Sequence, residues 1–370
     1  MRKSLKQKLF MFMSLAFIVS ILVACGNSND ASGNNNGNGG GNGDVTIEIV
    51  AKGFQHDFWR AVKLGAEEAA EDLGAKINFV GPKDEQAIAE QVEMLNNAIN
   101  KNPSAVALAA LDTEASLDAI SQATNAEIPI IGFDSGVPDA PEGAIAANAA
   151  TDNYEAGALA AENMYPGIED KLTGEDIVRI GVVAQEVNSL SITERTVGFI
   201  DKLVVLIEDN DAIGDGNVAV AGHDKLKNDV RADDAKVIIE TRVPATINDA
   251  AGQTEAQTLL EKDDLIAIYG SNEFAAKSII NADDALSGNV IGKDGVIAVG
   301  FDSGAMQIDA IKNERFYGSV TQDPVQIGYQ TVELAIKAAN GEEVEDVDTG
   351  AVWYNAENIE DEDVQPLLYE

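Results

Sequence analysis

Two aspartates stand in the same five-residue setting at widely separated places in the chain. The pentapeptide Gly-Phe-Asp-Ser-Gly occurs at residues 132–136 and again at 300–304, which places carboxylates at Asp134 and Asp302. Each copy follows a short apolar run, as expected of a buried parallel strand that ends in a loop. Because ligands of open α/β sheets bind beyond the carboxyl ends of the strands, we expect both aspartates to face one cleft. The alternative is that Asp-Ser-Gly serves only as turn chemistry.

The elements that must position these aspartates alternate regularly from residue 45 onward. Strand-like apolar runs and amphipathic helix-like segments follow one another, and the alternation restarts after residue 153. Repeated βα units predict parallel sheets with right-handed crossovers, and two rounds predict two similar, doubly wound α/β lobes. The predicted strands are 45–51, 77–80, 105–110, 128–133, 144–147, 177–184, 218–221, 236–240, 265–269 and 296–301, and the predicted helices are 58–73, 85–100, 114–125, 154–165, 192–207, 250–262 and 273–284.

The first 43 residues predict a leader and a tether. A basic start is followed by an apolar stretch at 9–24, which is short for a membrane span and typical of a signal peptide. The sequence Leu-Val-Ala-Cys-Gly at 22–26 looks like a bacterial lipobox, in which Cys25 is lipidated and becomes the mature N-terminus. An ordinary cleaved signal with an incidental cysteine is the alternative.

Residues 25–43 continue from this cysteine into a run of Asn, Gly, Ser, Asp and Ala, which predicts a flexible tether. We therefore expect a signal peptide at 1–24, a tether at 25–43, and an extracytoplasmic domain anchored to the outer face of the bacterial cell membrane. Cys25 is the only cysteine, so no internal disulfide can form and the core must hold the fold.

The charge of the chain excludes one class of partner. The chain carries 63 acidic and 25 basic side chains, for a formal net charge of −38. Nucleic-acid binding depends on Lys and Arg side chains that neutralise phosphates, so this surface would repel DNA and RNA. The acidic loop at 209–217 lacks the closing Glu of a calcium loop, and no metal site is expected.

Seven short motifs follow one another in order after the tether. They are His-Asp-Phe-Trp at 56–59, Ile-Pro-Ile-Ile-Gly-Phe-Asp at 128–134, Thr-Asp-Asn-Tyr-Glu-Ala-Gly at 151–157, Arg-Thr-Val-Gly-Phe at 195–199, Gly-Ser-Asn-Glu at 270–273, Val-Gly-Phe-Asp at 299–302 and Gln-Asp-Pro-Val-Gln-Ile-Gly at 322–328. Together they resemble the type I periplasmic solute-binding proteins of the ribose-binding class, in their lipid-anchored Gram-positive form. The resemblance covers essentially all of the chain after the tether.

This resemblance implies lobes that are discontinuous in sequence. The chain would cross between them three times, with lobe 1 formed by 44–151 and 323–348 and lobe 2 by 152–322 and 349–370. The three crossings would form a hinge, so that a ligand contacting both lobes favours a closed arrangement. The implied function is a monomeric, non-enzymatic receptor without a cofactor, which captures a small neutral sugar or polyol and delivers it to a membrane ABC-type permease.

The family motifs also imply a set of ligand contacts. Carried over residue by residue, they are His56, Phe58, Trp59, Asp134, Arg195, Asn272, Asp302 and Gln322. Each carboxylate would accept hydrogen bonds from two neighbouring hydroxyls. Arg195 would offer a planar donor fork, and the two amide side chains both donors and acceptors. The aromatic rings would cover the apolar face of a sugar.

Most of these residues have a structural alternative. Phe58 and Trp59 could simply pack beneath their helix, and Arg195 could form a surface ion pair. Asn272 could cap a helix, which is a common role of Asn after a strand. Gln322 precedes an Asp-Pro helix start, so a role in that turn is its alternative.

The chain departs from the ribose binders at three contacts. His56 stands where they carry Asn, and it could donate to a ligand hydroxyl or cap the helix that follows. Ser135 stands where they carry Arg, and their Asn after the third strand is replaced in a stretch that ends in Asp112. These changes leave ribose itself unassigned. They also leave Arg195 as the only evident counter-charge for an anionic ligand, which favours a neutral one.

Nothing in the sequence supplies the motifs of an enzyme. A Gly-x-Ser-x-Gly elbow, a His-Glu-x-x-His pair and a phosphate loop are all absent. A ligand sensor for a membrane signalling receptor would have the same fold and remains the main alternative, followed distantly by a carboxylate-based glycoside hydrolase. A transcription regulator of the same fold is excluded by the anchor, the acidic charge and the lack of a basic DNA-binding segment.

Overall fold

The computed structural model describes residues 45–369, and these residues form two α/β lobes, each built on one sheet. Cys25, the predicted signal peptide and the predicted tether lie outside the described residues. Among residues 45–369, no helix is both long and apolar enough to cross a bilayer.

Lobe 1 contains a six-stranded sheet whose neighbouring strands all run parallel, in the order β12-β5-β4-β3-β1-β2. Side chains alternate between its faces: Ile47 and Ile49 of β1 pack beneath α1 and α9, whereas Val50 packs beneath α2 and α3. The elements are β1 (Thr46–Val50), α1 (Asp57–Leu73), β2 (Lys76–Val80), α2 (Ile88–Asn100), β3 (Ala105–Leu108), α3 (Leu117–Asn125), β4 (Ile130–Phe133), β5 (Ala147–Ala150), α9 (Pro324–Ala339) and β12 (Val347–Asp348).

Lobe 2 contains a seven-stranded sheet in the order β13-β11-β10-β9-β6-β8-β7, parallel except for the edge strand β13, which pairs antiparallel with β11. Ile180 and Val182 of β6 pack beneath α4 and α5, and Val183 packs on the opposite face with α6, α7 and α8. The elements are α4 (Asn153–Ile168), β6 (Val178–Val183), α5 (Leu190–Glu208), β7 (Val218–Ala221), β8 (Val237–Arg242), α6 (Asp249–Leu260), β9 (Leu265–Gly270), α7 (Glu273–Ala285), β10 (Ile297–Phe301), α8 (Ala305–Lys312), β11 (Gly318–Gln322) and β13 (Ala351–Tyr354), with short 3-10 turns at Glu169–Lys171, Ala232–Asp234 and Gln365–Leu367.

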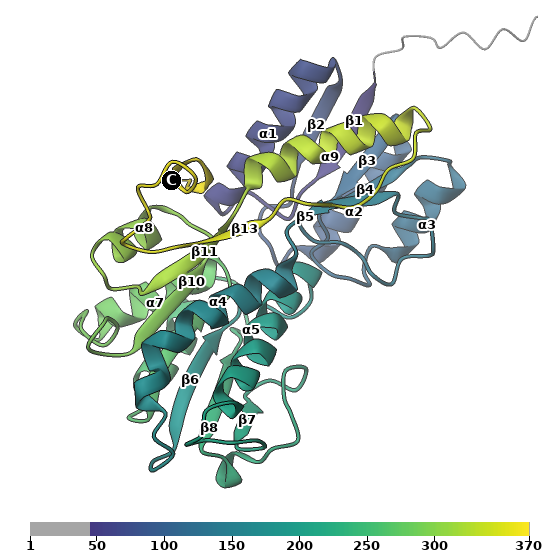
Figure 1. The fold of residues 1–370 in the computed structure, drawn as a ribbon. Helices are drawn as coiled ribbons and strands as arrows, with labels where there is room; N and C mark the ends of the chain where they lie inside the picture. Colours follow the sequence, from purple (N-terminus) through teal and green to yellow (C-terminus); the bar gives the residue numbers. More distant parts are fainter. Residues whose placement is uncertain (1–44, 370) are drawn as a thin grey trace, which may run out of the picture. The chain divides into compact units, whose positions relative to one another are not determined.

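The chain passes between the two sheets three times. It leaves lobe 1 after β5, returns from β11 to α9, and leaves again from β12 to β13. Figure 1 shows the returning helix α9, in yellow-green, lying beside α1, in purple, although the two are far apart in sequence. The predicted fold of two doubly wound parallel lobes is confirmed, while the exact lobe boundaries stay a prediction.

Paired glycines allow one helix pair in each lobe to approach closely. A Cβ on Gly65 of α1 would collide with the carbonyl O of Val325, and one on Gly328 of α9 with that of Val62. In lobe 2, Gly157 of α4 and Gly198 of α5 face the carbonyls of Arg195 and Tyr154 in the same reciprocal way. Three of these glycines lie in the motifs that carry the family resemblance.

Several predicted element boundaries were wrong by about three residues; for example, α3 begins at Leu117 and not at residue 114, and α4 ends at Ile168 and not at residue 165. Helix α2 begins at Ile88, not at Glu85, because residues 81–87 form a turn that carries Glu85 into the interior. The strand predicted at 144–147 lies at Ala147–Ala150, because Ala144 closes a turn onto the carbonyl of Pro141. Elements after residue 304 other than the start of α9 were not predicted. One of them, β11, has the sequence Gly-Ser-Val-Thr-Gln, which lacks a continuous apolar run.

Candidate functional site

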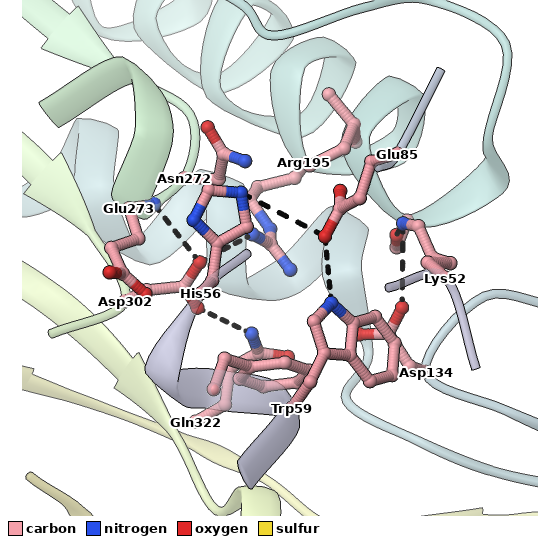
Figure 2. Close-up of a pocket in the computed structure, with 13 residues that line it drawn as sticks. Lys52, His56, Trp59, Glu85, Asp134, Arg195, Asn272, Glu273, Asp302 and Gln322 are labelled. Carbon is pink, nitrogen blue, oxygen red and sulfur yellow. Dashed lines mark hydrogen bonds and ion pairs between the residues drawn. The ribbon is translucent and has the colours of Figure 1, made fainter. Parts of the chain in front are cut away.

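Residues from both lobes line one small cavity at the carboxyl ends of the strands. All eight predicted ligand contacts are among its lining residues, and so are Lys52, Glu85, Ser191, Ile192 and Glu273. The cavity has about 30 Å³ of free space, enough for only one or a few water molecules. Figure 2 shows how the polar side chains converge on it.

Asp134 and Asp302 reach the cavity through the same backbone geometry. Each follows a buried strand, β4 or β10, and each is 5% exposed. Their φ angles are 55° and 70°, in the left-handed region that Asp tolerates better than most residues. Each backbone N–H is tied to the neighbouring strand, that of Asp134 to Ala149 O at 3.0 Å and that of Asp302 to Val320 O at 2.7 Å. This turn aims both carboxylates into the cavity.

A lysine that the sequence analysis missed opposes Asp134. Lys52 lies just after β1 and is 3% exposed. Its Nζ is 3.5 Å from Asp134 Oδ2, and it also donates to the hydroxyls of Ser189 at 3.3 Å and Ser191 at 3.1 Å. The expectation that Arg195 is the only counter-charge was therefore wrong. The strand-end rule that singled out Asp134 would have found Lys52 as well.

Arg195 lies in the interior of lobe 2 and not on its surface, because it is only 2% exposed. Its Nε and Nη2 donate to Asn153 Oδ1 at 3.2 and 2.7 Å, and its Nη1 donates to Ser271 O at 3.1 Å. Nη1 also lies 3.5 Å from Asp302 Oδ2, and the guanidinium stacks 3.6 Å from the ring centroid of Phe301. The surface ion-pair alternative is thus excluded.

Both amide side chains form hydrogen bonds within the protein, Asn272 through its oxygen and its nitrogen and Gln322 through its nitrogen alone. Asn272 caps α7, since its Oδ1 accepts from Ala275 N at 3.0 Å, and its Nδ2 donates to Gln185 Oε1 at 2.8 Å. Gln322 donates from Nε2 to Asp302 Oδ1 at 2.6 Å, while its buried Oε1 has no partner among residues 45–369. The helix-cap alternative for Asn272 holds, and its ligand contact stays a prediction.

The aromatic residues belong both to the core and to the cavity wall. Phe58 and Trp59 are 6% and 2% exposed and pack edge-to-face at 5.1 Å. Trp59 Nε1 donates to Glu85 Oε1 at 2.7 Å, which fixes the indole in the wall. His56 occupies the N-cap position of α1 without a side-chain capping bond, and its Nε2 lies 3.8 Å from Glu85 Oε1. The capping alternative for His56 is therefore wrong.

Glu85 and Glu273 are the cavity carboxylates that the sequence analysis missed. Burial alone would raise the pKa of Glu85, but the charges of His56 and Lys52 and its hydrogen bonds outweigh burial and hold the pKa below its ordinary value. For Glu273, burial and the neighbouring Asp302 raise the pKa to about 8. Burial likewise raises the pKa of Asp134, although Lys52 opposes the shift.

Ser135 and Asp112, two positions at which the chain departs from the ribose binders, both lie outside the cavity wall. Ser135 does not line the cavity; its hydroxyl accepts from Ser191 N at 3.3 Å. Asp112 accepts from the backbone of Glu114 and Ala115 in a local turn and also lies outside the cavity wall. Within the described residues, no cluster of three or more His, Cys, Asp or Glu side chains is placed to hold a metal ion.

The sequence matches a known domain over most of its length. Residues 47–343 match the family model described as the periplasmic binding protein domain. The chain belongs to this family. The predicted resemblance is confirmed.

Relatives of this periplasmic binding protein include transport proteins. The ribose import binding protein of Salmonella typhimurium is 25% identical over 301 residues, which cover 81% of this chain and 86% of that protein. The ribose import binding protein of Bacillus subtilis is 24% identical over 304 residues, which cover 82% of this chain and 84% of that protein. Their names describe binding proteins for import and not enzymes.

Solved structures agree with the fold over 88% of the chain. An ABC transporter solute-binding protein from Agrobacterium vitis with bound D-fucose has a TM-score of 0.73 and 28% identity, and all of it is covered. A chain from Brachyspira murdochii described as "ABC transporter, LacI family transcriptional regulator" has a TM-score of 0.73 and 38% identity, with 99% covered. These structures share the fold of this periplasmic binding protein.

Proposed function

We propose that this protein captures a small neutral sugar or polyol in the cavity between its lobes and delivers it to an ABC-type permease. The observation that carries the proposal is the pair Asp134 and Asp302, one from each lobe, on the same cavity. A ligand that donates hydroxyls to both carboxylates contacts both lobes at once. Such a ligand favours the arrangement in which the lobes face each other.

The cavity offers polar side-chain atoms that lack a hydrogen-bond partner, which suits ligand hydroxyl groups because a hydroxyl both donates and accepts. Gln322 Oε1 and Glu273 Oε2 are buried without a hydrogen-bond partner in the part of the chain that the structure describes. The cations are more heavily committed: Lys52 contacts Asp134, Ser189 and Ser191, and Arg195 is held by Asn153, Ser271 and Asp302. Anionic ligands are disfavoured because both cations are already paired with carboxylates, Lys52 with Asp134 and Arg195 with Asp302.

Ligand entry requires the lobes to separate. A free volume of about 30 Å³ is far below the roughly 300 Å³ or more of a usual ligand pocket. Three chain crossings connect the lobes, and they are the natural place for the hinge. The Phe58 and Trp59 rings then supply the apolar wall against one face of a sugar ring.

The experiment that tests the site is calorimetric titration of the purified protein. The panel comprises pentoses, hexoses, 6-deoxy sugars, inositols, disaccharides, an amino sugar and a polyamine, and it includes D-ribose, D-fucose and D-arabinose. We expect tight one-to-one binding of a neutral sugar or polyol. Binding of only the amine ligands, or of nothing by folded protein, would reject the neutral-sugar assignment.

Lipid anchoring through Cys25 and delivery to a permease are separate parts of the proposal. Membrane association of the wild-type chain is compared with that of Cys25→Ala in fractionated bacterial cells. We expect the wild type in the membrane fraction and the variant released. Equal partitioning of the two would reject the anchor and leave the sugar site standing.

A further inference from the structure

A continuous hydrogen-bond chain crosses from one lobe to the other beside the cavity. Trp59 Nε1 donates to Glu85 Oε1 at 2.7 Å, and Gln185 Nε2 donates to Glu85 Oε2, also at 2.7 Å. Gln185 Oε1 in turn accepts from Asn272 Nδ2 at 2.8 Å, and Asn272 caps α7. Trp59 and Glu85 belong to lobe 1, whereas Gln185 and Asn272 belong to lobe 2. Figure 2 shows the Trp59–Glu85 part of the chain.

This hydrogen-bond chain consists of buried side chains, and nearly all of their donors and acceptors have a partner. Glu85 is 6% exposed and Gln185 1% exposed, and each carboxylate oxygen of Glu85 receives one of the two donors. The turn that presents Glu85 is itself held, because Glu85 N donates to Gln55 Oε1 at 3.0 Å. Gln185 lies two residues after the end of β6. Both ends are thus fixed to their own lobes.

We propose that the Glu85–Gln185 contact is a latch of the closed arrangement, beside the bonds of Lys52 to Ser189 and Ser191, and that it couples lobe closure to the placement of the Trp59 ring. This rests on the proposed hinge closure around a sugar. Glu85 and Gln185 lie on different lobes, so their bond exists only while the lobes face each other. A contact made in one arrangement alone shifts the population towards it.

The latch depends on more than the Glu85–Gln185 pair, because the neighbouring side chains fix which group donates and which accepts. Asn272 donates to Gln185, and both Gln185 and Trp59 donate to Glu85. Asn272 Oδ1 is committed to Ala275 N, so Asn272 can offer Gln185 only a donor. In a Glu85→Gln variant, residue 85 has one acceptor for two donors, Trp59 Nε1 and Gln185 Nε2. Whichever way the amides turn, one N–H faces another N–H. Such a mismatch leaves a buried donor unsatisfied.

Exchange of the two side chains removes the mismatch. In the double variant Glu85→Gln, Gln185→Glu, the new amide oxygen accepts from Trp59 and its NH2 donates to the new carboxylate. The other oxygen of that carboxylate accepts from Asn272 Nδ2. Every hydrogen bond of the wild-type network is restored, and the negative charge of the carboxylate moves from lobe 1 to lobe 2. Rescue by this exchange distinguishes a direct contact between the lobes from a merely local packing role.

The test uses small-angle scattering without added sugar, together with Trp59 fluorescence in a Trp353→Phe background that leaves a single tryptophan. We expect E85Q and Gln185→Ala to increase the radius of gyration and to shift the Trp59 emission. The exchange variant should return both towards the wild-type values. The side chain of Gln185 hydrogen-bonds to Glu85 and Asn272 and not to Trp59, so a shift in Q185A reports the coupling through Glu85.

The chain offers a matched control on the surface of α6. Gln257 Nε2 donates to Glu261 Oε1 at 2.7 Å, the same chemistry at the same distance but within lobe 2 and exposed. Gln257→Ala and Glu261→Gln should leave the radius of gyration and the emission unchanged. Circular dichroism checks that every variant is folded.

The outcomes separate the latch from the sugar site. The latch would be overturned if E85Q and Q185A both kept the wild-type radius of gyration and Trp59 emission. It would also be overturned if the exchange variant folded but did not return these two values towards those of the wild type. Titration with D-ribose, D-fucose and D-arabinose is scored independently: where one of them binds the wild type, E85Q and Q185A should bind it about tenfold more weakly. A change in radius without binding of any panel sugar would support the latch and reject the proposed ligand.

Discussion

Asp134 and Asp302 occupy equivalent places in the two lobes, and each faces a cation of its own lobe at the same distance. Asp134 Oδ2 lies 3.5 Å from Lys52 Nζ, and Asp302 Oδ2 lies 3.5 Å from Arg195 Nη1. Both aspartates have a positive φ directly after a Gly-Phe strand end. Each lobe therefore brings one half-neutralised carboxylate to the cavity, which suits a ligand that donates hydrogen bonds without carrying a charge.

The first prediction concerns these two aspartates. Asp134→Asn and Asp302→Asn should each weaken sugar binding by about 10- to 100-fold, because a charge-assisted acceptor becomes a neutral amide. Both variants should stay folded, since Asn tolerates the left-handed backbone that these positions require. Titration calorimetry measures the binding, and thermal unfolding measures the fold.

Two further variants, Asp302→Ala and Asp224→Asn, serve as comparisons. Asp302→Ala should be less stable than Asp302→Asn by about 1 kcal/mol, because Ala has no side chain that favours φ of +70°. Asp224→Asn removes an exposed acid, 94% accessible at its side chain, and should not affect binding. Wild-type affinity in both cavity variants would reject the cleft assignment.

The second prediction concerns Lys52. Lys52→Met should destabilise the fold by about 3–5 kcal/mol, because it leaves the buried carboxylate of Asp134 without its counter-charge. The pKa of Asp134, already raised by burial, should rise further. Urea unfolding at pH 7 measures the loss. Adding Asp134→Asn should restore part of it, and strict additivity of the two changes would contradict the pairing.

The fold was largely predictable because the core strands are continuous apolar runs. The runs Ile-Ile-Gly-Phe of β4 and Ile-Ala-Val-Gly-Phe of β10 are buried on both faces, and such continuous apolar runs by themselves predict buried parallel strands. The edge strands β12 and β13 are short and partly exposed, so the sequence gives them no such pattern. Their membership depends on contacts with strands about 30 to 200 residues earlier in the chain, which periodicity does not encode.

The site was predictable where a motif marked it and not elsewhere. All eight predicted contacts line the cavity because strand ends and family motifs placed them. Lys52 and Glu85 were missed for different reasons: a lysine after a strand is usually solvated, and Glu85 was read as the first residue of a helix. Their burial depends on partners from lobe 2, Ser189, Ser191 and Gln185, whose proximity only the folded chain reveals.

The third prediction concerns the close approach of α4 and α5. Gly157→Ala should destabilise the fold by about 1–3 kcal/mol, because its Cβ would meet the backbone carbonyl of Arg195, which cannot give way as a side chain can. It should also weaken sugar binding, since it displaces the backbone that carries the Arg195 side chain. Urea unfolding and calorimetry measure the two effects.

The same helix provides the control. At Gly167 the nearest atom to a new Cβ is a side-chain methyl of Ile297 at 3.4 Å, which is an ordinary contact. Gly167→Ala should therefore be neutral, or stabilise α4 by up to about 1 kcal/mol through the higher helix propensity of Ala. If Gly157→Ala were as well tolerated as Gly167→Ala, the close helix contact would not be under steric constraint.

The last prediction concerns pH. Burial and Asp302 raise the pKa of Glu273 from 4.5 to about 8, so between these values the folded protein binds a proton that the unfolded chain has released. The stability that protonated Glu273 contributes is complete below pH 4.5 and is lost as pH rises through about 8. Glu273→Gln keeps the shape of the side chain and removes the titration. The wild type should therefore lose stability relative to this variant with rising pH, by about 1.4 kcal/mol per pH unit at most.

Urea unfolding of both proteins at pH 5, 7 and 9 measures this difference. Asp302→Asn provides a second check, because loss of the neighbouring charge should lower the pKa of Glu273 and move the transition to lower pH. Since Glu273 and Asp302 both line the cavity, affinity for a neutral sugar should change over the same pH range in the wild type and much less in Glu273→Gln. A stability difference that stays constant from pH 5 to 9 would mean that Glu273 ionises as an ordinary carboxylate, and the cavity would then hold one more negative charge at neutral pH.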